Sequence, residues 1–186
     1  MSQIIIDSAM TREQALLFGL PENCPEDVLN QMTIVDVKYI SFDQQLHKGQ
    51  VVIHRDLEKD IKTIFELALS LKFPITQVTP ISDERFNWDD TTSMEANNTS
   101  AFNYRMKIGK PGEISMHGRG RAIDINPRLN PYIRGSLIHP AGSTYQPGNA
   151  GVLTADHPLV LRFKELGWSW GGDWVDLKDY QHFEKG

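Results

Sequence analysis

The chain has 186 residues, of which 40% are hydrophobic and 23% charged, and its formal net charge is -5. These are ordinary values for a globular protein, and the length is sufficient for one core, so we expect a single folded unit. The acidic balance argues against a nucleic-acid-binding protein, which would need a basic face. The single cysteine, Cys24, excludes an internal disulfide and a cysteine-based zinc cluster.

The sequence contains no candidate membrane segment, because no apolar run approaches the roughly 20 residues that a spanning helix needs. At the N-terminus, Ile4, Ile5 and Ile6 form too short a run for a signal peptide, and no basic residue precedes them. We therefore expect a chain made in the cytoplasm with no membrane partner. A substrate outside the cell would require another route of release or export.

The first 32 residues are predicted to form a helical extension that packs on a domain of residues 33–186. Thr11 and Gln14 fit a capping box ahead of an apolar run, and Gly19 is typical of a helix end. A second, brief helical piece is expected around Val28 and Leu29.

A hairpin and a helix are predicted next. Residues 33–42 and 50–54 alternate like strands, with a turn at residues 47–49. Asp56 then caps the clearest helix, whose apolar residues recur at helical spacing up to Leu71. The helix ends before Pro74, and residues 75–78 are predicted to be a strand.

The second half contains two long stretches without a period, residues 82–100 and 126–155, which we interpret as loops that shape a site. Strands are expected at residues 101–106, at 121–125 and around His182 and Phe183. A helix begins at Asp156 and Pro158 and ends at Gly167, and Gly171 and Gly172 are expected to form a hairpin turn. The pattern has no regular alternation of strand and helix, so we predict an α+β fold with a mostly antiparallel sheet flanked by helices.

Two short stretches carry the candidate chemistry. His117 and Asp124 lie seven residues apart with small residues between them, and near the C-terminus Asp179 precedes His182 by three residues. Catalytic zinc takes three protein ligands and keeps a position for water. If His117 lies on a loop that enters the strand of Asp124, with Gly118 and Gly120 allowing the close return, and His182 comes from a neighbouring strand, the three can meet around one zinc ion. Asp179 at the edge of the metal could accept a proton from the bound water.

Other conspicuous residues have simpler explanations. Most histidines in proteins are surface residues or hydrogen-bonded core residues rather than metal ligands, and we expect this of His47 and His54. His139 and His157 each precede a proline, which suits a turn or a helix cap. A tryptophan cluster is more often core than groove wall. Of Trp168, Trp170 and Trp174, at least one is expected in the core, and Trp170 is our candidate for a substrate contact.

The two stretches closely resemble the motifs of a known family. Ser115, His117, Gly120, Ala122 and Asp124 stand at the spacing of the first zinc motif of the M15 metallopeptidases. The segments 167–174 and 179–183 resemble the C-terminal motif of that family in its endolysin-like branch, and the resemblance covers roughly residues 33–184. It implies a zinc fold similar to those of Hedgehog and of D-Ala-D-Ala peptidases, with one catalytic zinc ion.

The resemblance also implies residue roles. His117, Asp124 and His182 would be the zinc ligands and Asp179 the catalytic base. Arg105 would hold the substrate carboxylate or polarise its carbonyl, although the segment between it and His117 is shorter than in the endolysins. Ser115 is either a contact to the substrate or to a zinc-binding residue, or a turn-forming hydroxyl, and the sequence leaves the two equally weighted.

The function implied by this family is zinc-dependent hydrolysis of peptide bonds in bacterial peptidoglycan stem peptides. The bond would be either the terminal D-Ala-D-Ala bond, cut by a carboxypeptidase, or the L-Ala-D-Glu bond, cut by an endopeptidase. The alternative is a zinc-containing binding module of Hedgehog-like fold without catalysis, which would be expected to lack the base. Asp179 is present, which favours the enzyme. The sequence does not predict the oligomeric state.

Overall fold

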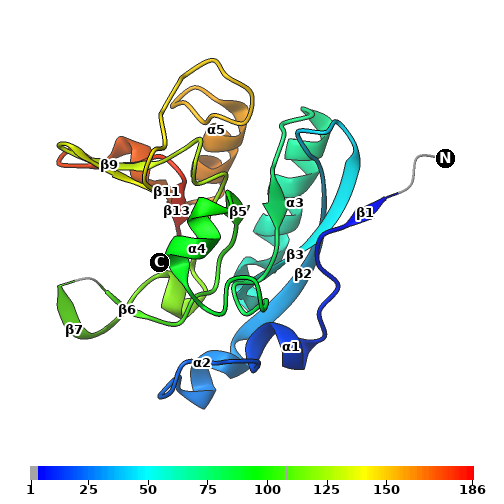
Figure 1. Ribbon diagram of the computed structural model, residues 1–186, viewed down its shortest axis with the longest axis vertical. Helices are drawn as coiled ribbons and strands as arrows, with labels where there is room; N and C mark the ends of the chain where they lie inside the picture. The colour runs from blue at the N-terminus through cyan, green and yellow to red at the C-terminus, as the bar shows by residue number, and fades with distance from the viewer. Residues whose placement is uncertain (1–3, 108) are drawn as a thin grey trace.

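The computed structural model describes residues 4–107 and 109–186 (Figure 1). Its helices are short apart from α3, and they are α1 (Arg12–Leu16), α2 (Glu26–Asn30), α3 (Glu58–Ser70), α4 (Asp90–Glu95) and α5 (Pro158–Glu165). Single turns of 3-10 helix occur at η1 (Arg55–Leu57), η2 (His117–Arg119) and η3 (Gly171–Asp173). None of the helices in these two described ranges is long and apolar enough to cross a membrane.

The strands form several small sheets rather than one large sheet. One sheet has the order β1-β3-β2 and joins β1 (Ile5–Ile6), β3 (Leu46–His54) and β2 (Met32–Ile40). A second has the order β11-β13-β8 and joins β11 (Ser169–Trp170), β13 (His182–Glu184) and β8 (Ala122–Asp124). A third has the order β10-β9-β12 and joins β10 (Leu137–His139), β9 (Tyr132–Arg134) and β12 (Lys178–Asp179). The remaining pairs are β4 (Gln77–Val78) with β5 (Asn98–Thr99), and β6 (Met106–Lys107) with β7 (Lys110–Ile114).

The predicted α+β class is confirmed, and the prediction of a mostly antiparallel sheet fits only loosely. Most strand pairs are antiparallel, but β1 with β3 and β4 with β5 are parallel, and the pairs are divided among separate sheets.

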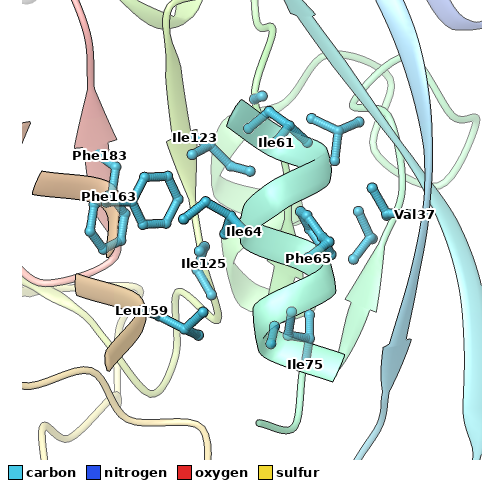
Figure 2. Packing of buried hydrophobic residues seen from close by; sticks show 14 of the residues in the cluster. Val37, Ile61, Ile64, Phe65, Ile75, Ile123, Ile125, Leu159, Phe163 and Phe183 are labelled. Carbon is cyan, nitrogen blue, oxygen red and sulfur yellow. The ribbon is translucent and has the colours of Figure 1, made fainter. Parts of the chain in front are cut away.

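Helix α3 lies between the first sheet and the second, in the centre of the main core (Figure 2). Its apolar residues follow helical spacing, and it presents Phe65 toward Val37 of β2 and Ile64 toward Ile123 of β8. Phe163 of α5 packs against this second sheet. Burial of such a side chain contributes about 1.5–3 kcal/mol. The packing of α3 on Ile123 of β8 and of Phe163 of α5 on Phe183 of β13 therefore holds the two strands that carry candidate ligands.

The N-terminal segment contributes to a second apolar cluster. The predicted capping box at Thr11 is confirmed, since its hydroxyl accepts from Gln14 N and its own N–H donates to Gln14 Oε1. Ala15 and Leu16 of α1 are buried against residues such as Phe102. A division of the chain at residue 32 stays a prediction.

Several predicted boundaries are wrong for local reasons. Residues 47–49 are not a turn but part of β3, and the hairpin turns at residues 41–45, where Gln44 has a φ of 63°. Asp56 does not cap α3, because it lies inside η1, where its N–H donates to His54 Nδ1. Gly171 lies in η3 rather than in a hairpin turn. Residues 101–105 are irregular, and the strand begins only at Met106.

The two stretches predicted as loops contain regular structure. Residues 82–100 hold α4 and β5, and residues 126–155 hold the β9–β10 hairpin. The start of α4 could have been predicted from Asp89, because aspartate is a preferred N-cap residue and Asp89 Oδ1 accepts from Thr92 N. The hairpin could also have been predicted, since Gly135 and Ser136 separate two apolar runs and Gly135 has a φ of 59°.

Candidate active site

Three elements bring the predicted ligands together. Strands β8 and β13 pair antiparallel with His182 directly opposite Asp124, so both side chains lie on one face of the sheet. His117 lies on η2, the 3-10 turn that precedes β8. The structure therefore joins residues that are 58 and 65 positions apart in the chain.

The three candidate ligand atoms lie at the spacing of a tetrahedral metal site. Asp124 Oδ1 is 3.0 Å from His182 Nδ1 and 3.3 Å from His117 Nε2, and the two nitrogens are 3.2 Å apart. Ligands at about 2.0–2.1 Å from a zinc ion in tetrahedral geometry are separated by roughly 3.3–3.4 Å. The three residues are buried, and each exposes only 6–7% of its surface. This group could hold one metal ion.

Hydrogen bonds fix which nitrogen of each histidine faces the site. His117 Nδ1 is 2.7 Å from the carbonyl oxygen of Ala101, and His182 Nε2 is 3.1 Å from Glu184 Oε2. Both acceptors require an N–H donor, which leaves His117 Nε2 and His182 Nδ1 free to bind a metal. Sequence reasoning missed Glu184. Its position two residues after His182 in a strand, hence on the same face, was the available signal.

The turn that carries His117 depends on its glycines, as the sequence predicted. Gly120 has a φ of 63°, and a Cβ at Gly118 would lie 2.8 Å from the carbonyl oxygen of Arg105. Ser115 Oγ accepts from Gly118 N at 2.9 Å and so holds the same turn. Of the two roles considered for Ser115, this contact is the turn-forming one.

The charges of the ligands depend on one another. Burial by itself favours the neutral forms, but His117 and His182 outweigh it and hold the pKa of Asp124 far below its usual range. Burial likewise disfavours a charged His182, yet the carboxylates of Asp124 and Glu184 raise its pKa to about 10. The site therefore stabilises negative charge on Asp124 and favours a cation beside it.

Asp179 of β12 lines the same cavity as the three candidate ligands. Burial, together with the nearby charge of Asp124, raises the pKa of Asp179 to about 6, although a hydrogen bond from Gln181 Nε2 at 3.1 Å opposes the shift. A carboxylate whose pKa lies near neutrality can accept and return a proton at physiological pH. This position is consistent with a general base.

The cavity has a volume of about 500 Å³ and two walls. One wall is formed by α4 and Arg105, and the other by the β9–β10 hairpin through Tyr132, Arg134, Leu137 and His139. Arg105 Nη1 donates to Asp90 Oδ2 of α4, and the other carboxylate oxygen, Asp90 Oδ1, accepts from Asn103 Nδ2 at 3.1 Å. Arg105 thus lies in the cavity, as predicted, and Asp90 is a partner that the sequence did not reveal because residues 82–100 had no clear period.

The tryptophans divide between core and site. Trp170 is 2% exposed, donates from Nε1 to the carbonyl oxygen of Tyr180 and does not line the cavity, so the prediction of a substrate contact is corrected. Trp168 is also buried, with its Nε1 bonded to Asp60. Trp174 instead lies with its ring centroid 5.5 Å from that of His182.

Of the other four histidines, three lie outside the cavity and one lines it. His47 and His54 are buried and hydrogen-bonded away from the cavity, and His157 caps α5 through Nδ1. His139 precedes Pro140, which was expected to suit a turn, and it lies in β10 and lines the cavity.

Comparison with known proteins gives a match that covers the segment carrying the candidate ligands. Residues 109–185 match the family model described as D-alanyl-D-alanine carboxypeptidase. No curated protein and no solved structure matches the chain significantly. The matched segment contains His117, Asp124, Asp179 and His182 and therefore the whole group of candidate ligands with the adjacent acid. Over residues 109–185 the chain is similar to the peptidases that this family model describes.

Proposed function

We propose that the protein is a zinc-dependent peptidase that hydrolyses a peptide bond in bacterial peptidoglycan stem peptides. We also propose that residues 33–186 adopt the zinc fold of the Hedgehog and D-Ala-D-Ala peptidase group. The family match supports peptidase activity in general. The preference for stem peptides follows from the family resemblance and from an acidic chain whose cavity nevertheless contains Arg105 and Arg134.

One observation carries the proposal. His117 Nε2, Asp124 Oδ1 and His182 Nδ1 lie 3.0–3.3 Å from one another in a cavity that also contains Asp179. Two histidines and one carboxylate are a ligand set of catalytic zinc, and an adjacent acid is what hydrolysis requires. A structural zinc site would instead be closed by a fourth protein ligand.

The residues of the chain divide the reaction among them. When bound, zinc would supply a Lewis acid that lowers the pKa of water and polarises a carbonyl group. Asp179 would accept a proton at a carboxylate oxygen and return it to the leaving amine. Arg105 would bind a carboxylate or the carbonyl oxygen of the substrate, and to do so it must exchange its contact with Asp90.

Ser115 would act indirectly. Its hydroxyl holds the Gly118 N–H and hence the turn that orients His117. We propose this positioning role for Ser115 in place of a direct contact with the substrate.

Mass spectrometry of defined stem peptides tests the proposal. The peptides are incubated with the protein loaded with zinc, and in parallel with a chelator. Zinc-dependent loss of terminal D-alanine would identify a carboxypeptidase, and cleavage after the first L-alanine would identify an endopeptidase. Absence of cleavage by protein shown to hold one zinc ion would refute the enzymatic function and favour a binding module.

A pair of variants tests the role of the base in the same assay. Asp179→Asn should retain zinc and lower turnover by about 10²–10⁴-fold, the usual contribution of a general base. Asp176→Asn changes an exposed acid in the same C-terminal segment and should leave turnover unchanged. Normal activity of Asp179→Asn would refute its assignment.

A further inference from the structure

Gln181 is a buried amide whose oxygen has no partner. Its residue is 2% exposed and lines the cavity between Asp179 and His182. Among the described residues, none forms a hydrogen bond with Gln181 Oε1. A buried amide oxygen without a partner costs free energy, so such groups are rare unless something outside the protein supplies the donor.

The rest of Gln181 is held in place. Its backbone carbonyl accepts from Ile125 N at 3.0 Å, which fixes the chain against the end of β8. Its Nε2 donates to Asp179 Oδ1 at 3.1 Å and lies 3.8 Å from Met94 Sδ of α4. Because the carboxylate of Asp179 requires a donor, the amide nitrogen points to Asp179 and the amide oxygen must point elsewhere.

We propose that Gln181 is a substrate-binding residue whose Oε1 accepts a backbone N–H of the peptide in the cavity. This inference rests on the proposed peptidase function, since it assumes that a peptide occupies the cavity. Peptide bonds present N–H donors at regular spacing, and a neutral amide oxygen accepts one without a charge partner. The same side chain then contacts both the proposed base and the substrate, which would align a peptide bond relative to Asp179.

Binding of matched peptides tests this contact independently of cleavage. Dissociation constants are measured by calorimetry, with a chelator present so that no peptide is cleaved. The ligands are a stem pentapeptide and analogues in which one peptide N–H at a time is replaced by an ester oxygen. The wild type should bind one of these analogues about five- to tenfold more weakly than the amide, the effect of one neutral hydrogen bond.

Variants show whether Gln181 causes that difference. Gln181→Met has a similar length but no acceptor, and it should bind the amide and the ester analogue equally. Because the amide and the ester are compared on the same variant, a general loss of shape would weaken both peptides alike and leave the preference in place. Gln146→Met makes the same exchange at an exposed glutamine outside the cavity, and as the control it should behave as the wild type.

The outcomes also separate this inference from the proposed function. A full preference retained in Gln181→Met, equal binding of all peptides by the wild type, or no peptide binding would each overturn the role of Gln181. Failure of the zinc-loaded wild type to cleave any stem peptide, with the N–H preference still dependent on Gln181, would overturn the peptidase function alone.

Discussion

Two buried histidines of this protein, His47 and His182, each lie between two carboxylates. His47 Nδ1 is 2.9 Å from Asp7 Oδ2, and its Nε2 is 3.1 Å from Asp43 Oδ2. The ring joins β3 to the segment that follows β1, so it connects the N-terminus to the first sheet. Both nitrogens are used by carboxylates, so in this region His47 has a structural role.

His182 has the same number of carboxylate partners and a different environment. Its Nε2 contacts Glu184, but its Nδ1 meets both Asp124 Oδ1 and His117 Nε2. These two nitrogens are 3.2 Å apart. Because His117 Nδ1 carries its hydrogen toward the carbonyl oxygen of Ala101, His117 Nε2 has a free lone pair that a cation can bind.

The comparison shows that carboxylates around a histidine do not by themselves indicate a metal site. What distinguishes the two regions is a third ligand atom at the distance of a tetrahedron edge, and a cavity of about 500 Å³ that reaches His182. Substitutions matched between the two regions can therefore test the distinction.

The largest difference is expected when each histidine is replaced by asparagine. His182→Asn removes a ligand and should abolish cleavage. Loss of a hydrogen-bond partner of a ligand lowers metal affinity by up to roughly 100-fold, and loss of the ligand itself should lower zinc affinity by more than that. His47→Asn should keep zinc content and cleavage and lower the free energy of unfolding by about 1–3 kcal/mol, since it removes the contact of the buried ring with Asp7. Zinc content by atomic absorption and urea unfolding measure the two effects. Equal zinc loss in both variants would refute the distinction.

The carboxylates behind the two histidines should differ in the same direction. Glu184→Gln removes the anionic acceptor for His182 Nε2 and should weaken zinc binding by about 10–100-fold. Asp43→Asn makes the corresponding change at His47 Nε2 and should leave zinc affinity unchanged. Competition with a fluorescent chelator gives both affinities. An unchanged affinity in Glu184→Gln would show that this hydrogen bond does not orient the ligand.

Zinc removal should reduce stability only through the region around His182, and the region around His47 should not contribute. A metal present at 100 times its dissociation constant stabilises a folded protein by about 2.7 kcal/mol. For a chain of this size that corresponds to roughly 5–10 °C in melting temperature, at about 2–4 °C per kcal/mol. Calorimetry with zinc and with a chelator should show this shift in the wild type and in His47→Asn and should show none in His182→Asn.

The site was predictable from the sequence because its residues lie in short motifs with fixed spacing. His117 and Asp124 are joined by a turn that needs Gly120, and His182 follows Asp179 by three residues, so local geometry and family resemblance were sufficient. The long helix α3 and the strand β2 were predictable because their apolar periodicity extends over 13 and 9 residues.

The walls of the cavity were not predictable in the same way. Helix α4 and the β9–β10 hairpin are too short to show a period, and tertiary contacts determine them. The contact of Asp90 with Arg105 joins residues 15 positions apart, which lie in different segments of the chain and share no local spacing. Trp170 was assigned to the wrong environment because nothing in the local pattern distinguishes a core tryptophan from Trp174, which lies beside His182.

The smallest expected effect is on the pH dependence of stability. Burial alone would lower the pKa of His47, but hydrogen bonds with Asp43 and Asp7 outweigh it, so the pKa is raised above its ordinary value of 6.5. A histidine whose pKa is raised on folding stabilises the protein fully below its unfolded pKa, and this contribution is lost as the pH rises through the folded pKa.

The free energy lost in His47→Asn should therefore be larger at about pH 5.5 than at about pH 8.5. Urea unfolding of the wild type and the variant, both with a chelator present, measures it. His54 provides the control of opposite sign, because burial lowers its pKa and its protonation in the unfolded state costs stability at acidic pH. His54→Asn should accordingly be least destabilising, relative to the wild type, at the lower pH. If the effect of His47→Asn did not change between the two pH values, its carboxylate partners would not be binding a charged ring, and the contrast with His182 would rest on metal geometry alone.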